Sequence, residues 1–564
     1  MTMKGMRKMT AVFLVAALGA GALAGCGGGG GKKENTETFV EVQIYDRGYG
    51  SDGIRAVAER YMELHEGVTI DITGVTDSTL ATDIYAGPSI VTTDLYFYGG
   101  DNLFNLVNSG SVTFDGVTYP NYFENLNEVY NAIPEGEDEA IKDKMLDSYE
   151  EFYNVDADLD GEPDGNYYCA PWMGGFTGII YNSKMFDNYG WTVPVTTDEL
   201  FELCDEILAT DAKSANKNSQ GESIDIAPFS FCLEDSYWEY VYLQWWAQYD
   251  GITAFENYFK GQDANGNYTP DVAASQGRLK MLEVLDGVLG TYSLENGEKV
   301  ARDNVYCDPT LATRSYIDTQ STFLNAEGAR VNLNGATTSA MMPNGDWLEN
   351  EMYTNFSDKI ESGEVEFKMM KTPVISAITD KLSFKDDMQL RELIRWIDGG
   401  KEGEKPSFAT DDDVKIVEEA RGIGSSIGQR YSVYIPSFAV AKEAAKDFLI
   451  FLYSDEGIRI NALSSRGNDL PFEYDWDSIR SELSVFENSK LDVLESTTAY
   501  ALNADNHPMR YRGGMAPFRI YMPVEANFNV SAAMDYIDPQ TIFIDNYNEF
   551  ERLWQTMMSD AGVL

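Results

Sequence analysis

One region of this chain alternates strand-like and helix-like segments in a regular order. Residues 40–44 and 68–72 alternate apolar with polar side chains, which is the period of a half-buried strand. Between them, residues 54–64 carry apolar side chains at helical spacing, and Gly67 ends that helix. The run 95–98 then predicts a third, buried strand. This order indicates an α/β fold in which helices cover both faces of a parallel sheet.

Two loops follow the carboxyl ends of predicted strands, which is where ligands bind in parallel sheets. In the loop 45–52, polar side chains lie among glycines that allow close backbone approach, although a plain solvated loop has the same composition. In the loop 99–102, the polar side chains either contact a ligand or cap the helix that follows. The candidate ligand-binding residues in these loops are Asp46, Arg47, Tyr49, Asp101 and Asn102.

The charge balance excludes whole classes of partner. The chain has 564 residues, with 92 Asp+Glu against 42 Lys+Arg and a formal net charge of −50. Phosphate backbones repel such a protein, so we expect no nucleic-acid partner. Hydrophobic residues make up 43% of the chain, enough for substantial cores, which argues against global disorder. The histidines are His65 and His507 alone, which leaves little room for histidine-based metal sites or catalytic triads.

The N-terminus indicates export. Residues 1–8 are basic, and the apolar run 11–24 is too short to span a bilayer as a helix but suits the core of a signal peptide. The run ends in Leu-Ala-Gly-Cys, which resembles a bacterial lipobox with Cys26 as the acylated residue; an ordinary signal peptide with a chance cysteine is the alternative. We therefore predict a signal peptide at 1–25 and a Gly-rich tether at 26–38. The protein would then be lipid-anchored on the outer face of the cytoplasmic membrane.

Four further cysteines would lie outside the cytoplasm, where an even number permits disulfides. They are sparse in a chain of this length, and Cys204 falls on the apolar face of a predicted helix. We therefore favour buried free thiols over two disulfides. The four residues are Cys169, Cys204, Cys232 and Cys307.

Residues 156–164 match the first part of an EF-hand-type calcium loop, with carboxylates at alternate positions and a glycine that turns the chain around one ion. Tyr167 stands where the bidentate glutamate of such a loop belongs, so another residue would have to complete the site; an acidic surface turn is the alternative. We predict a structural calcium ion and otherwise no required cofactor. The candidate ligands are Asp156, Asp158, Asp160, Glu162 through its backbone carbonyl, and Asp164.

Several segments resemble one known family, in the order that the family has them. The most specific is 167–207, with Pro171 before a crossover, then Tyr-Asn, then Pro-x-Thr before a helix. Residues 340–352, AMMPNGDWLENEM, resemble the family's Ala-Met…Gly-x-Trp segment. With the lipobox and the segments 40–75, 94–112 and 434–457, the chain resembles the bacterial extracellular solute-binding proteins, specifically the maltose-binding-like family that serves carbohydrate ABC transporters.

The resemblance implies a two-lobed periplasmic-binding-protein-like α/β fold with a hinge of three crossings. It implies a first lobe of about 39–170 plus 373–466 and a second of about 171–372 plus 467–564. The ligand would lie in the cleft between the lobes, and closure would be a hinge motion. The chain is longer than typical members, and the segments 112–165, 209–230 and 380–430 are the expected places of the extra residues.

A sugar site needs aromatic planes for C–H faces and polar side chains for hydroxyls that lose their water. The resemblance places one tryptophan beside the first crossover and another in the segment that often supplies a stacking ring. A third lies in the aromatic-rich run 237–249, which is more typical of a core, and core packing is the alternative for all three. Two polar residues lie near the third crossover. These candidates are Trp172, Trp347 with its neighbour Asp346, Trp238, Arg466 and Asn468.

The resemblance implies a lipid-anchored, monomeric binding protein that captures an extracellular oligosaccharide and delivers it to an ABC permease. It implies no enzymatic activity. Two alternatives stay open at this point. A secreted, lipid-anchored glycoside hydrolase needs only two carboxylates, and an acidic chain cannot lack a candidate pair. A binder of peptides or another solute on the same fold is the second.

Overall fold

The computed structural model describes residues 37–564, except for 101, 157–162, 210–224, 234–236, 308–314, 325–336, 521–522 and 531–534. Thr38–Leu564 form one compact unit, and the fold below is that of this unit. The predicted signal peptide and Cys26 lie outside the described residues. None of the helices in the described ranges combines the length and the apolar character that a membrane span requires.

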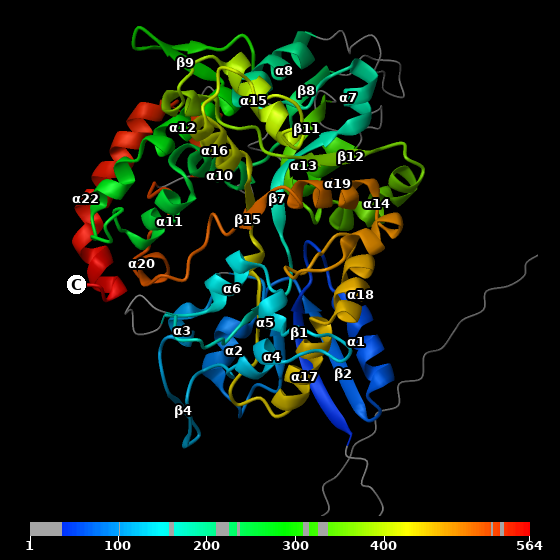
Figure 1. Ribbon diagram of the computed structural model, residues 1–564. Helices are drawn as coiled ribbons and strands as arrows, with labels where there is room; N and C mark the ends of the chain where they lie inside the picture. Colours follow the sequence, from blue (N-terminus) through cyan, green and yellow to red (C-terminus); the bar gives the residue numbers. More distant parts are fainter. Residues whose placement is uncertain are drawn as a thin grey trace, which may run out of the picture. The chain divides into compact units, whose positions relative to one another are not determined.

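The first sheet joins strands that are far apart in the sequence (Figure 1). Its order is β2 (Val68–Val75), β1 (Thr38–Tyr45), β3 (Leu95–Phe97), β14 (Ser432–Tyr434) and β6 (Ala170–Pro171). β1 runs parallel to β2 and β3, as the alternation of the sequence predicts, whereas β14 is antiparallel to both β3 and β6. The α/β fold class is therefore confirmed in this sheet.

Helices cover both faces of the first sheet, and a short hairpin projects from the same region (Figure 1). α1 (Asp52–Leu64) packs against α17 (Lys442–Leu452) and α18 (Asp455–Ser465), so a late segment of the chain covers an early strand. The remaining elements are α2 (Leu80–Ala86), α3 (Phe104–Val107), the hairpin β4 (Val112–Phe114) and β5 (Val117–Tyr119), α4 (Asn127–Asn131), α5 (Ile141–Lys144) and α6 (Asp147–Tyr153).

The second sheet is mixed. Its order is β15 (Thr498–Tyr500), β13 (Ile423–Ser426), β7 (Phe176–Asn182), β11 (Thr337–Gly345) and β8 (Asp225–Phe229), and β12 (Phe367–Met370) also pairs with β7. β11 is antiparallel to β7 and parallel to β8. The apolar run of β7 has both its faces buried, which fits its central place in the sheet.

Helices surround the second sheet, and α10 (Glu239–Asp250) packs on it through β7, β11 and β13. α12 (Gln276–Leu289) lies between α10 and the long C-terminal helix α22 (Pro539–Ala561) (Figure 1). The other elements are α7 (Ser183–Tyr189), α8 (Thr197–Ala209), α11 (Ile252–Lys260), β9 (Tyr292–Glu295), β10 (Glu298–Ala301), α13 (Tyr316–Leu324), α14 (Leu348–Glu361), α15 (Asp387–Asp398), α16 (Asp411–Arg421), α19 (Val485–Leu494), α20 (Pro508–Tyr511) and α21 (Glu525–Phe528).

The chain passes from the first sheet to the second between β6 and β7, returns between β13 and β14, and leaves again after α18. The return passage lies between the end of β13 at Ser426 and the start of β14 at Ser432, so the chain crosses back later than the predicted lobe boundary at 372/373. Ser425 of β13 pairs with Thr177 of β7, and the Arg421 guanidinium donates to the carbonyl of Thr372 at 3.0 Å. Residues 373–426 therefore belong with the second sheet, because the insertion there contributes a sheet strand and buried polar contacts.

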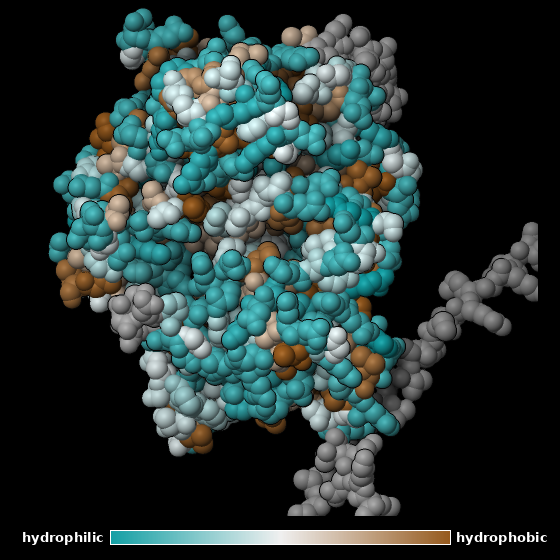
Figure 2. Space-filling model, in the orientation of Figure 1, coloured by the Kyte–Doolittle hydropathy of each residue, from teal (hydrophilic) through white to brown (hydrophobic). Residues whose placement is uncertain are grey.

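The four described cysteines are buried and free of disulfides, as predicted. Burial raises the pKa of the Cys169 thiol to about 12 and that of the Cys204 thiol well above its usual value. These thiols are therefore neutral core side chains at physiological pH. The outer face seen in Figure 2 is covered mainly by hydrophilic residues, as the charge balance of the sequence leads one to expect.

Candidate functional site

A small pocket lies where the loop after β1 meets the start of α14, and we call it the aromatic pocket. Its volume is about 130 Å³. The end of β1 and the loop after it line one side, helices next to the second sheet line the other, and residues from two of the passages between the sheets complete it. The lining residues are Tyr45, Arg47, Gly48, Tyr49, Met173, Tyr237, Tyr240, Tyr316, Trp347, Glu351, Ile427 and Tyr431.

The loop after β1 is held in place by hydrogen bonds at both of its ends. The Asp46 amide donates to the Val75 carbonyl at 2.8 Å, and the Gly50 amide donates to the Arg47 carbonyl at 3.2 Å. Gly48 has a φ of 64°, a left-handed conformation that favours glycine. The side chain of Asn350 in α14 donates to the Gly48 carbonyl at 2.9 Å. The loop is thus fixed to the second sheet as well as to the first.

Trp347 forms one wall of the aromatic pocket and directly precedes α14. Its ring lies 6.0 Å from that of Tyr240 and 6.3 Å from that of Tyr49, in both cases edge to face. The ring also lies against the Cα of Gly345, where a Cβ would have no room. These contacts hold one ring orientation and leave only a small part of Trp347 exposed.

Behind the aromatic pocket, a buried polar network connects the two sheets. The Tyr49 hydroxyl donates to Asp346, whose other carboxylate oxygen accepts from the Phe176 amide at 3.2 Å. Lys490 of α19 lies 3.6 Å from Asp346 and pairs with Asp469 at 2.6 Å. Burial raises the pKa of Asp346 well above its usual value, against the opposing effect of Lys490. For Lys490 burial lowers the pKa, but the charges of Asp469 and Asp346 outweigh it and leave the pKa raised.

Three of the predicted ligand-binding residues, Arg47, Tyr49 and Trp347, line the aromatic pocket. Asp346 lies directly beneath it in the buried network. Asp46 is exposed and is not part of the lining. The side chain of Asn102 donates to the Gln429 carbonyl at 2.8 Å, so it fastens its loop to a passage. Asp101 lies outside the described residues.

The prediction that Trp172 and Trp238 present faces to a ligand is wrong in this structure, because both rings are fully buried. The Trp172 indole donates to the Tyr98 carbonyl at 3.0 Å and packs edge to face behind Tyr431. Trp238 packs against Phe229 and other aromatic rings of the core. Core packing, the alternative considered for both, accounts for them.

The residues predicted near the third crossover also lie away from the aromatic pocket. The guanidinium of Arg466 stacks 3.6 Å from the centre of the Tyr353 ring. Asn468 is buried; its side chain donates to the Trp172 carbonyl at 3.1 Å and accepts from the Gly174 amide at 3.2 Å. Asn468 therefore ties two passages together, which is a structural role rather than ligand contact.

The predicted calcium loop is only partly described. Asp158, Asp160 and Glu162 lie outside the described residues, whereas Asp156 and Asp164 at its two ends are described. The Asp164 amide donates to the Val155 carbonyl at 2.8 Å, which brings the ends of the loop together. Elsewhere in the described ranges, no group of three or more His, Cys, Asp or Glu side chains is arranged to hold a metal ion.

Sequence reasoning missed most of the tyrosines of the aromatic pocket. Tyr237 lies in the turn just before α10 and Tyr240 in its first turn, and both line the pocket, whereas Trp238 between them is fully buried. Helical spacing in the aromatic-rich run offered a signal for this division. Tyr316 and Tyr431 come from segments with no local pattern that indicates a binding site.

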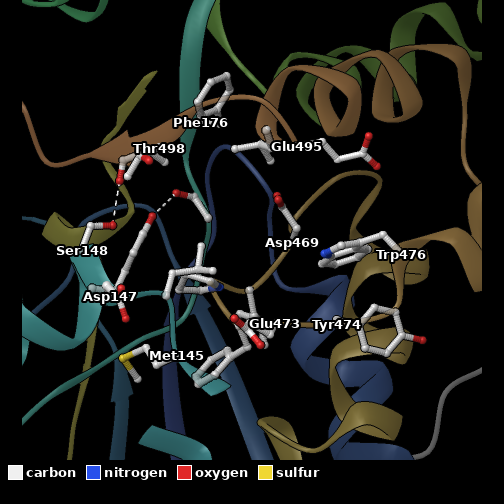
Figure 3. Close-up of a pocket in the computed structure, with 18 of the residues that line it drawn as sticks. Met145, Asp147, Ser148, Phe176, Asp469, Glu473, Tyr474, Trp476, Glu495 and Thr498 are labelled. Carbon is white, nitrogen blue, oxygen red and sulfur yellow. Dashed lines mark hydrogen bonds between the residues drawn. The ribbon is translucent and has the colours of Figure 1, made fainter. Parts of the chain in front are cut away.

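A second, larger cavity of about 610 Å³ lies between α6, α19 and the segment after α18, and we call it the acidic cavity (Figure 3). Trp476 and Tyr474 lie on one side of it and Ser148 and Thr498 on the other, with Asp469 between them. Its described lining has no lysine or arginine. The acidic lining residues are Asp143, Asp147, Asp469, Glu473 and Glu495.

Comparisons with known proteins agree with this architecture. Residues 48–282 match the family model described as bacterial extracellular solute-binding protein. No curated protein matches the chain. Among solved structures, unliganded RafE from Streptococcus pneumoniae is 13% identical with a TM-score of 0.51, over 92% of this chain and 98% of that chain.

Two further solved structures are similar to the same extent. A chitin oligosaccharide binding protein is 15% identical with a TM-score of 0.50, over 93% of this chain and 99% of that one. Maltose-bound MalE3 of T. maritima is 13% identical with a TM-score of 0.50, over 92% of this chain and 100% of that one. Likeness at these identities shows that the two-lobed α/β fold is shared.

Proposed function

We propose that this protein is the substrate-binding component of a carbohydrate ABC importer. Its residues 48–282 match the family model of bacterial extracellular solute-binding proteins. It captures an extracellular oligosaccharide in the aromatic pocket and delivers it to a membrane permease. Acylation of Cys26 holds it on the outer face of the cytoplasmic membrane. It binds and releases its ligand without chemical change.

The observation that carries the proposal is the composition and place of the aromatic pocket. Aromatic rings offer flat apolar faces to the C–H faces of a sugar, and the charged groups of Arg47 and Glu351 offer hydrogen bonds to its rim. The pocket lies beyond the carboxyl end of β1, where ligands bind in parallel sheets. The solved structures of similar fold include proteins described as bound to maltose or as binding chitin oligosaccharide.

The volume of the aromatic pocket, about 130 Å³, is below the roughly 300–1,000 Å³ of common ligand sites. An oligosaccharide therefore needs the loop after β1 and the start of α14 to move apart. We propose that this opening is a hinge motion about the passages between the sheets. The link between Tyr49 and Asp346 would break and reform in each cycle.

The test is a binding screen of the purified protein by calorimetry against oligosaccharides, monosaccharides and peptides, followed by chromatography of each ligand. We expect saturable binding of one class of oligosaccharide and recovery of that ligand unchanged. Binding of peptides alone would replace the substrate class while leaving the fold. Accumulation of shorter saccharides during the incubation would instead indicate a hydrolase.

A further inference from the structure

Arg47 is the basic residue in the described lining of the aromatic pocket. Within the described part of the chain, its side chain has no hydrogen bond and no ion pair. As far as the described residues go, the five N–H donors of this cationic group are available to a ligand.

Several arginines of this acidic chain pair with carboxylates, whereas others, such as Arg55 and Arg519, bind a hydroxyl or carbonyl oxygen instead. The sequence supplies 92 acidic residues for 42 basic ones. Arg391 pairs with Glu202 at 2.6 Å, Arg421 with Asp398 at 2.8 Å, and even the exposed Arg552 with Glu549. Among the described residues, Arg47 has neither kind of partner, although Glu351 lies in the same pocket lining.

The loop that carries Arg47 is fixed in place. Hydrogen bonds from the Asp46 amide, the Gly50 amide and the Asn350 side chain hold its backbone on both sides of Arg47. The Tyr49 hydroxyl anchors the next side chain to Asp346. The Asp46 and Gly50 hydrogen bonds do not involve α14 and can persist when the loop and α14 move apart, so a ligand group that meets Arg47 pays little entropy to order the loop.

Two other polar groups of the aromatic pocket, Glu351 and Tyr45, do not add a free negative charge beside Arg47. The single described carboxylate in the lining, Glu351, already accepts a hydrogen bond from Gln320 at 2.7 Å. Burial, with a smaller contribution from Tyr431, raises the pKa of Tyr45 to about 12, so its hydroxyl keeps its proton at neutral pH. In the acidic cavity the arrangement is reversed, with five carboxylates and no basic residue in its described lining.

We propose that the solute is an acidic oligosaccharide, in which the carboxylate of a uronic acid unit is bound by Arg47 while its ring contacts the surrounding aromatic side chains. A guanidinium matches a carboxylate with two parallel charge-assisted hydrogen bonds. This inference rests on the proposed function and narrows its substrate class.

The test compares matched pairs of saccharides that differ only at C6, such as oligogalacturonides and galacto-oligosaccharides of the same linkage and length. Calorimetry with the purified protein should give an affinity at least roughly tenfold higher for the acidic member, since charge-assisted hydrogen bonds are the stronger ones. Added salt should weaken binding of the acidic member and leave the neutral one unchanged.

Variants of Arg47 assign the preference to this residue. Arg47→Gln should abolish the preference by weakening the acidic member alone, whereas Arg47→Lys should keep part of it because the charge stays and the bidentate geometry is lost. Arg552→Gln, which removes an exposed arginine outside the pocket, should change neither affinity.

Three results would overturn the inference. Equal affinity for both members, unaffected by Arg47→Gln, would leave a carbohydrate-binding protein with a neutral substrate, so the proposed function would stand without the narrower claim. Preference for a sulfated saccharide over the uronate would contradict the carboxylate assignment. Binding of peptides but of no saccharide would remove the proposed function itself.

Discussion

The hydroxyl of Tyr49 donates a hydrogen bond to the carboxylate of Asp346, and the two residues are 297 positions apart in the sequence. Tyr49 follows β1 of the first sheet, and Asp346 follows β11 of the second. The same hydroxyl accepts from the Gly175 amide at 3.2 Å, in the passage between β6 and β7. One side chain thus joins both sheets and a connection between them.

Tyr49→Phe should destabilise the protein, because Asp346 and the Gly175 amide both lose a buried partner. We expect a loss of about 1–3 kcal/mol in the free energy of unfolding, measured by urea denaturation. Tyr547→Phe removes a hydroxyl that donates to Asp271 at 3.0 Å on the surface, and its effect should stay within about 0.5 kcal/mol. Equal losses in the two variants would mean that the buried Tyr49–Asp346 hydrogen bond stabilises the protein no more than a surface hydrogen bond does.

Trp347→Ala should weaken saccharide binding by about 1–3 kcal/mol, as expected for a central aromatic side chain of a binding site. Calorimetry with the ligand found in the screen measures this loss. Trp476→Ala is the matched control, since Trp476 lines the acidic cavity instead. Retained affinity in Trp347→Ala with a lowered melting temperature would show that the ring serves packing alone.

Glu525 should make stability depend on pH. Burial, reinforced by Glu239, raises its pKa from 4.5 to about 8, so the folded protein keeps a proton that the unfolded chain releases. Stability should therefore fall as the pH rises through this range, and the fall should be complete above about pH 8. The substitution Glu525→Gln should flatten this dependence.

The difference between the urea midpoints of wild type and Glu525→Gln from pH 6.5 to 8.5 measures the effect of Glu525, because Glu349, whose pKa burial raises to about 7, titrates in the same window in both proteins. Burial lowers the pKa of His507 from 6.5 to about 4, so that residue acts below this window and with the opposite sign. Glu551→Gln, at an exposed position of α22, is the control and should leave the slope unchanged. A slope that is the same in wild type and Glu525→Gln would contradict the assignment.

Calcium should raise the melting temperature if the acidic loop 156–164 binds the ion, because a ligand that binds only the folded state stabilises it. Asp158→Ala should abolish this rise, since it removes a carboxylate from the centre of the pattern. Asp411→Ala, which removes an exposed carboxylate of α16, should leave it intact. A rise that persists in Asp158→Ala would place the ion elsewhere.

Local pattern was sufficient for some features and insufficient for others. The alternation around β1 and β2 predicted a parallel pair, because the period of side-chain burial depends on only a few neighbouring residues. It could not place the boundary near 373, because β13 joins the second sheet through pairing with Thr177, far away in the sequence. Sheet partners are chosen by tertiary contacts that no local period encodes.

The sequence by itself determined the α/β class, the acidic surface, the buried thiols and the loop that carries Arg47 and Tyr49, because composition and short-range spacing fix these. The tertiary structure decided which aromatic residues face the pocket. Trp172 and Trp347 both come just after strands, β6 and β11, yet Trp172 is fully buried behind Tyr431 and Trp347 borders the pocket. Burial of an aromatic ring is set by neighbours from distant segments, and those neighbours meet only when both sheets are formed.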